Sequence, residues 1–241
     1  MFTQHDIEWD DTKVARLWDY YSARENTHYF SELHGGDLLE ATGLPLTAPL
    51  RHLDFGCGNG FLWDHLKRLR AGWRYTGIDF SERSVGTVQA KATGDPRFEQ
   101  AFRIRSLPTP LQAESYDVIT IIEVVEHLTD EYLVDTLTEA TRLLKGDGYL
   151  VISTPNAERL EDNHKFCPDC GSVFHEWQHV RTWTQESLDR YVSNFGYEVE
   201  RAVITDFGAV GIARRAAAFA RRLLERKHKA PHLMIVFRKK R

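Results

Sequence analysis

Residues 51 to 155 alternate short apolar segments with amphipathic ones, and this alternation constrains the fold more than any other feature. The segment 116–124, YDVITIIEV, is apolar at nearly every position, which is typical of a strand buried on both faces. Apolar strands that alternate with amphipathic helices predict a parallel sheet covered by helices on both sides. The expected strands are 51–55, 74–79, 98–105, 116–124 and 149–154, and the expected helices are 61–69, 82–92 and 131–144.

The pattern divides the whole chain into four segments. We expect a helical cap, a core, a Cys/His-rich insertion over the carboxyl ends of the strands, and a segment that completes the sheet. Their bounds are 1–45, 46–155, 156–183 and 184–241. In the cap we expect a helix over 9–23, a loop containing Gly35 and Gly36, and a second helix over 37–42. The last segment carries the predicted helix 184–195, strands 197–204 and 232–239, and a basic helix 211–229.

The composition sets limits on location and partners. The 241 residues include three cysteines, too few for a fully paired disulfide framework, and no apolar run long enough for a membrane span. The acidic N-terminus does not resemble a signal peptide, so we expect a cytoplasmic protein. The net charge of −4 gives no general attraction to nucleic acid. The basic helix 211–229 either packs on the sheet or makes a peripheral contact with the inner face of an anionic membrane.

A glycine-rich turn follows the first core strand. In LDFGCGNG, residues 53–60, three glycines let the backbone turn sharply and approach a ligand that a Cβ would repel. Asp54 precedes them and could hold an ammonium group, whereas Asp79 ends the next strand, where it could accept ribose hydroxyls. The spacing lacks the Lys-Ser/Thr of a phosphate-binding loop and the G-x-G-x-x-G of nicotinamide enzymes.

This D-x-G-x-G-x-G motif with an acidic second strand end resembles that of the class I S-adenosylmethionine-dependent methyltransferases. The resemblance covers roughly residues 50 to 155, and the last two strands match as well. It implies a Rossmann-like, doubly wound, seven-stranded α/β sheet with mostly parallel strands. It also implies S-adenosylmethionine as cofactor, with Phe80 beside the adenine. The predicted cofactor-binding residues are Asp54, Gly56, Gly58, Gly60, Asp79, Phe80, Ser106, Leu107 and Glu123.

Ionisable residues cluster where the strand 116–124 ends. Glu123, Glu126 and His127 lie at the edge where a doubly wound sheet binds its ligands, and two carboxylates with an imidazole suit a divalent cation. The alternative is that Glu126 and His127 only cap and pack the turn. Similar E-x-x-E-H motifs occur in ubiquinone-biosynthesis O-methyltransferases and in small-RNA 3′-terminal 2′-O-methyltransferases. The latter also carry a later H-x-x-x-W-T, which His179 begins here.

Both resemblances imply O-methylation. The catalytic candidates are Glu126, His127 and His179, and the candidate ligands of a divalent metal are Glu123, Glu126, His127 and His179.

The insertion contains a second set of metal-binding residue types. Cys167 and Cys170 form a C-P-x-C-G turn, and His175 follows at a spacing close to that of a zinc knuckle. His179 or His164 would supply the fourth ligand, so the two metal proposals compete for His179. The alternative is a lid with free thiols and surface histidines. The insertion is similar to one in bacterial methyltransferases of surface-polysaccharide and natural-product type, which favours a sugar or small-molecule hydroxyl as acceptor over RNA.

The leading hypothesis is therefore O-methylation of a small-molecule or glycan hydroxyl, using S-adenosylmethionine. Either His127 or a divalent metal, Zn or Mg, deprotonates the acceptor. Metal-dependent 2′-O-methylation of an RNA 3′ end is the second hypothesis. The core segment lacks an extended basic surface or aromatic platform for it. The third is a non-catalytic, S-adenosylmethionine-binding regulatory protein, which the intact E-x-x-E-H disfavours.

Overall fold

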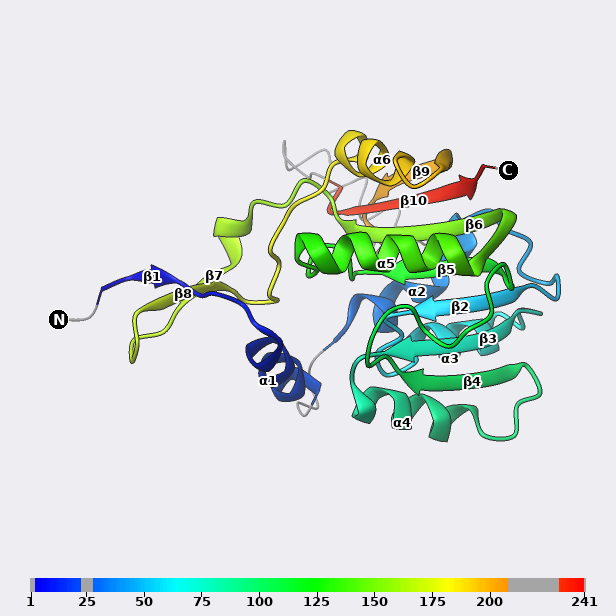
Figure 1. Cartoon of the computed structure of the whole chain (residues 1–241), viewed down its shortest axis with the longest axis horizontal. Helices are drawn as coiled ribbons and strands as arrows, with labels where there is room; N and C mark the ends of the chain where they lie inside the picture. Colours follow the sequence, from blue (N-terminus) through cyan, green and yellow to red (C-terminus); the bar gives the residue numbers. More distant parts are fainter. Residues whose placement is uncertain (1–2, 23–27, 208–229, 241) are drawn as a thin grey trace, which may run out of the picture.

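The computed structural model describes residues 3–22, 28–207 and 230–240. Within them a seven-stranded sheet has the order β4-β3-β2-β5-β6-β10-β9 (Figure 1). β10 runs antiparallel to β6 and β9, and the other neighbours are parallel, which confirms the predicted fold class. The strands are β2 (Arg51–Phe55), β3 (Arg74–Asp79), β4 (Phe98–Arg103), β5 (Tyr116–Ile122), β6 (Leu144–Pro155), β9 (Tyr197–Thr205) and β10 (His232–Lys239).

Helices cover both faces of this sheet. One buried cluster joins the sheet to α5 (Asp130–Leu143) and α6 (Gln185–Ser193). The other joins it to α2 (Phe30–Ala41), α3 (Phe61–Arg68) and α4 (Glu82–Ala92). Because successive side chains of a strand point to opposite faces, β10 contributes Leu233 and Ile235 to the first cluster and Met234 to the second.

A small second sheet lies beyond the edge at which β2 and β3 end (Figure 1). It has the order β1-β8-β7, with β1 (His5–Asp6) parallel to β8 (Ser172–His175) and β7 (His164–Phe166) antiparallel to it. A 3₁₀ helix, η1 (Leu160–Asn163), precedes β7. The sequence pattern did not predict β1, which joins the N-terminal segment to the insertion.

The predicted opening helix is present as α1 (Asp11–Ser22) and packs on the insertion. The ring of Tyr21 stacks on Trp177 with centroids 4.7 Å apart, and Trp18 Nε1 donates to Gln178 Oε1 at 3.3 Å. The N-terminal cap thus contacts the insertion through aromatic side chains. The division of the chain into four segments stays a prediction.

The prediction of a loop at Gly35 and Gly36 was wrong, because both lie inside α2. A Cβ on Gly35 would come within 2.7 Å of Cδ2 of His65, and one on Gly36 within 2.9 Å of its Nδ1. The His65 ring is held in place by a contact of 2.9 Å between its Nε2 and the Glu32 carbonyl oxygen. The two glycines therefore permit close packing of α2 on α3 rather than a turn.

The predicted basic helix 211–229 lies outside the described residues. No helix in the described part of the chain is long and apolar enough to cross a membrane.

The close packing at Gly35 predicts a measurable difference between two glycine substitutions in helices. We expect Gly35→Ala to lower the free energy of unfolding by about 1–3 kcal/mol, because the new methyl group overpacks against His65. Gly86 lies in α4 with open space where a Cβ would be, so Gly86→Ala should be neutral or stabilise by up to about 1 kcal/mol. Urea denaturation of both variants checks this. Equal stability of Gly35→Ala and wild type would contradict the packing argument.

Candidate active site

The glycine turn links β2 to α3 and needs glycine for two reasons. Gly56 and Gly60 have φ values of +82° and +75°, a region that other residues rarely adopt. A Cβ on Gly56 would also come within 2.7 Å of Val124, in the turn that follows β5. The glycine turn and the Glu123–His127 turn therefore pack directly against each other. Gly58 has open space beside its Cα, as a ligand-facing position requires.

Asp79 connects this turn to the end of β3. Its Oδ2 accepts a hydrogen bond from the Gly58 amide at 2.9 Å, and its Oδ1 accepts one from the Ser81 amide at 2.8 Å. Burial raises the pKa of the carboxyl group. A carboxylate fixed in this way retains free lone pairs, so it suits the predicted contact with ribose hydroxyls.

Asp54 is almost fully buried. Its carboxylate accepts hydrogen bonds from the hydroxyls of Tyr75 at 2.8 Å and Thr120 at 3.0 Å, which come from the two strands beside β2. Burial raises its pKa to about 6. Asp54 therefore ties three strands together beneath the glycine turn, and its predicted contact with the ammonium group stays a prediction.

The predicted adenine-binding residues follow the ends of β3 and β4. The Phe80 side chain is half-exposed, and Arg103 Nε donates to the Phe80 carbonyl oxygen at 2.8 Å. Ser106 is exposed, whereas Leu107 packs partly buried against the core. These three positions remain predictions for the adenine site.

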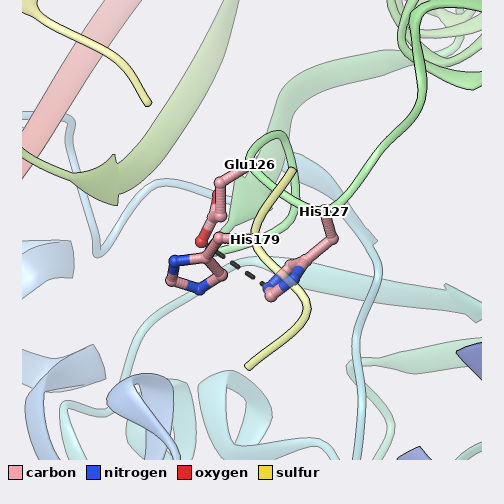
Figure 2. A group of neighbouring side chains, drawn as sticks. All are labelled: Glu126, His127 and His179. Carbon is pink, nitrogen blue, oxygen red and sulfur yellow. Dashed lines mark ion pairs between the residues drawn. The ribbon is translucent and has the colours of Figure 1, made fainter. Parts of the chain in front are cut away.

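Three predicted catalytic residues come together beyond the end of β5. One ligand atom from each of Glu126, His127 and His179 lies within 4.8 Å of the others (Figure 2). The insertion brings His179 there, because the Val180 amide donates to the Glu126 carbonyl oxygen at 2.9 Å and Gln178 Nε2 donates to that of His127 at 2.8 Å. The structure thus unites residues that are 52 positions apart in the sequence.

Burial determines the charges of this group. Only 1% of Glu126 is exposed, and burial raises the pKa of its carboxyl well above the usual value. Its Oε2 accepts a hydrogen bond from Thr154, but its Oε1 has no hydrogen-bond partner and lies 3.7 Å from Nε2 of His127. Burial lowers the pKa of His127 to about 3, and Nδ1 of that ring also has no partner. His127 is therefore neutral at neutral pH, burial disfavours the charged form of Glu126, and both side chains keep polar atoms free for a ligand.

Glu123 does not join this group. Its Oε1 accepts a hydrogen bond from the Ser153 hydroxyl at 2.7 Å, and burial raises its pKa to about 7. The φ of Glu123 is +53°. Two more non-glycine residues have a positive φ: Ala157, which precedes Glu158, and Gln178, which precedes His179. Backbone strain of this kind tends to gather at functional sites.

The structure does not bring the predicted zinc ligands together. Cys167 and Cys170 lie at the tip of the β7–β8 hairpin, whereas His175 pairs with His164 at its base. At about 3.3 Å per residue, His175 lies roughly 10 Å along the strand from the tip, too far for one zinc ion. Among the described residues, neither metal-binding group of three contains a cysteine.

The sequence pattern missed Glu158, which follows β6. It forms a second group with His175 and His179, whose ligand atoms also lie within 4.8 Å of one another. The side chains of His175 and His179 stack with centroids 4.3 Å apart. An acid directly after an apolar strand was the available signal, because that is the edge where ligands bind.

The fold and the site define a class of protein that binds its ligand at the carboxyl edge of a Rossmann-like sheet. The profile of the methyltransferase-domain family matches residues 36–202. A solved S-adenosylmethionine-dependent methyltransferase from Mesorhizobium loti shares the fold, with a TM-score of 0.61 and 17% identity over 85% of this chain and 98% of that one.

Curated relatives agree with this. The ubiquinone biosynthesis O-methyltransferase of Bordetella bronchiseptica is 31% identical over 64% of this chain and 61% of its own length. The human mitochondrial enzyme of that name is 31% identical over 67% of this chain and 44% of its own length. The chain thus spans less than two thirds of these relatives. It belongs to the class I S-adenosylmethionine-dependent methyltransferases and is distantly homologous to the ubiquinone-biosynthesis O-methyltransferases.

The position of Asp79 predicts a specific loss of cofactor affinity. We expect Asp79→Asn to weaken S-adenosylmethionine binding by about 10- to 100-fold, because a hydrogen bond to a charged group contributes about 1.5–3 kcal/mol. Glu82→Gln is the matched control, since Glu82 is exposed at the start of the next helix. Isothermal titration calorimetry measures both affinities. An unchanged affinity of the Asp79 variant would remove this residue from the cofactor site.

The raised pKa of Glu123 predicts a pH-dependent stability. The Glu123 carboxyl keeps its proton up to about pH 7 in the folded chain, whereas its ordinary pKa is 4.5. The protonated carboxyl therefore favours the folded state at low pH. This contribution to stability is lost as the pH rises from 4.5 to about 7. Relative to Glu123→Gln, which keeps the bond from Ser153, wild type should lose on the order of 1–3 kcal/mol across it. Urea denaturation at several pH values tests this. Glu131→Gln, at an exposed position, should follow wild type, whereas parallel curves for Glu123→Gln would refute the expectation.

Proposed function

We propose that the chain methylates a hydroxyl oxygen of a small molecule or of a glycan. The Glu126–His127–His179 group would take up the hydroxyl proton or hold the cation that acidifies it. The observation that carries this proposal is the position of the group, with Glu126 buried and two unpartnered polar atoms, directly after Val124, which packs on the glycine turn. A hydroxyl needs such a group, because it must lose its proton to become a good nucleophile.

The methyl group passes from the sulfonium to the acceptor oxygen in one in-line step. The oxygen–methyl bond forms as the sulfur–methyl bond breaks, and the electron pair stays on sulfur. The chain contributes mainly alignment, since holding two reactants in place accounts for much of the rate of such a transfer. The packing of Val124 on Gly56 fixes the distance between the cofactor turn and the acceptor group.

Charge considerations distinguish the three side chains. His127, with its pKa lowered to about 3, is a weak base. We assign the hydroxyl proton to His179, whose ring belongs to the same group. One ligand atom from each of Glu126, His127 and His179 lies within 4.8 Å of the others, a set that also suits a divalent cation. When bound, such a cation would lower the pKa of the acceptor hydroxyl.

Two considerations favour oxygen as the methylated atom. The curated relatives carry the name O-methyltransferase, and they are 31% identical to this chain over 64% and 67% of its length. An amine acceptor is already a nucleophile when neutral and does not require the buried acid and imidazole set found here.

The proposed function predicts that substitutions in the Glu126–His127–His179 group lower turnover without weakening cofactor binding. We expect Glu126→Ala and His127→Asn to lower turnover by on the order of 100-fold, because each removes polar atoms that face the reacting hydroxyl or its cation. Both should bind S-adenosylmethionine as wild type does, since neither residue touches the glycine turn. Turnover is measured by transfer of a radiolabelled methyl group to a panel of catechols, phenols and glycans.

An RNA with a free 3′-terminal ribose belongs in the same panel, and so do amines. Label in an ether linkage on a small molecule or glycan supports the proposal. Label on RNA or on nitrogen contradicts it, as would full activity of the Glu126 variant. Omission of metal and addition of Mg²⁺, Mn²⁺ or Zn²⁺ then determines whether a cation takes part.

A further inference from the structure

Glu158 lies near the Glu126–His127–His179 group and stays charged because of its polar contacts. Its Oε2 lies 2.5 Å from Nδ1 of His179, and its Oε1 lies 3.3 Å from Nε2 of His175. Asn163 Nδ2 donates to the same Oε1 at 2.9 Å. These contacts hold the pKa of Glu158 well below its usual value, despite partial burial. A carboxylate thus stands between two histidines, of which His179 belongs to the acceptor group.

The tautomer of His175 follows from its backbone contacts. The amides of Trp177 and His179 both donate to its Nδ1 at 3.2 Å. Nδ1 therefore carries a lone pair, and in the neutral ring the proton must lie on Nε2, which faces Glu158. This arrangement argues against a metal ion between Glu158, His175 and His179. A metal-bound imidazole nitrogen has no proton, and its other nitrogen usually donates a hydrogen bond.

The same reasoning extends to His179. The ionised Glu158 carboxylate only accepts hydrogen bonds, so Nδ1 of His179 must donate its proton to it. Nε2 is then the nitrogen that keeps a lone pair. A ring fixed in this state is ready to receive a proton from a hydroxyl or to bind a cation at Nε2.

We propose that Glu158 is a positioning residue for methyl transfer, which fixes His179 as the Nδ1–H tautomer and leaves the Nε2 lone pair for the acceptor. Backbone amides fix His175, a hydrogen bond from Asn163 holds Glu158, and Glu158 fixes His179. During transfer the hydroxyl proton moves to Nε2 as the oxygen takes the methyl group. The resulting imidazolium is stabilised by Glu158 until it releases the proton to water. This proposal rests on the proposed function for its catalytic consequence but not for the tautomer.

The substitution Glu158→Gln tests the tautomer directly. Two donors, Asn163 and His175, face the Oε1 position, so the amide oxygen of the glutamine should occupy it. The amide nitrogen then faces His179 Nδ1 as a donor, which requires the opposite tautomer, Nε2–H. Nitrogen-15 NMR of the histidine rings at pH 9, on the full chain with S-adenosylhomocysteine bound, distinguishes the two tautomers.

Three further variants complete the experiment. Glu158→Asp retains a carboxylate and should retain the Nδ1–H tautomer. Glu158→Ala, which removes the partner altogether, should give a mixture of tautomers, and it replaces Glu158→Gln if that variant does not fold. Glu176→Gln is the matched control, because this insertion glutamate pairs with Lys165 rather than with a histidine. It should leave His179 unchanged.

The expected result is Nδ1–H in wild type and Nε2–H in Glu158→Gln. With an acceptor from the panel above, kcat should fall by on the order of 100-fold in that variant and recover in Glu158→Asp, with KM for S-adenosylmethionine unchanged. An Nε2–H tautomer in wild type, or the same tautomer in wild type and Glu158→Gln, overturns the proposal. Failure to find any hydroxyl acceptor would instead count against the proposed function, because the NMR result does not depend on turnover.

Discussion

The parallel pairing of β2 with both β3 and β5 is the constraint on which the site depends. In this register Asp54 lies opposite Gly77 on one side and Thr120 on the other, and its carboxylate hydrogen-bonds to hydroxyls from both strands. Because parallel strands end at one edge, the glycine turn, Asp79 and Glu123 all emerge there. The cofactor residues and the acceptor group are thus consequences of a single packing arrangement.

Burial then decides what this edge can do. Only 1% of Glu126 is exposed and burial disfavours its charged form, while His127 is neutral at neutral pH. Buried polar atoms without a partner are costly, which supports the proposal that an acceptor or a cation binds there. The charged carboxylate is that of Glu158, which hydrogen-bonds to Asn163 and to His179.

The insertion acts as the second half of the site rather than as a separate unit. It delivers His179 to Glu126 and His127, and it packs through Trp177 and Gln178 on α1. Trp18 of α1 also meets the His127 ring edge-on, with centroids 5.1 Å apart. α1, the Glu123–His127 turn and the insertion therefore enclose the imidazole rings of His127 and His179. Gln178, with its positive φ, lies in the turn that brings His179 there.

The sequence by itself determined the sheet, the glycine turn and the Glu126–His127 pair, because strand periodicity and turn glycines are local signals. It also placed His179 near them through a resemblance. Tertiary structure alone decided that Gly35 and Gly36 pack a helix, that His175 lies away from the cysteines, and that Glu158 joins both histidines. Spacing along the chain cannot fix such contacts, since hairpin register and helix packing set which side chains meet. Burial, likewise, exists only in the folded chain, and it sets the charges on which the proposed chemistry depends.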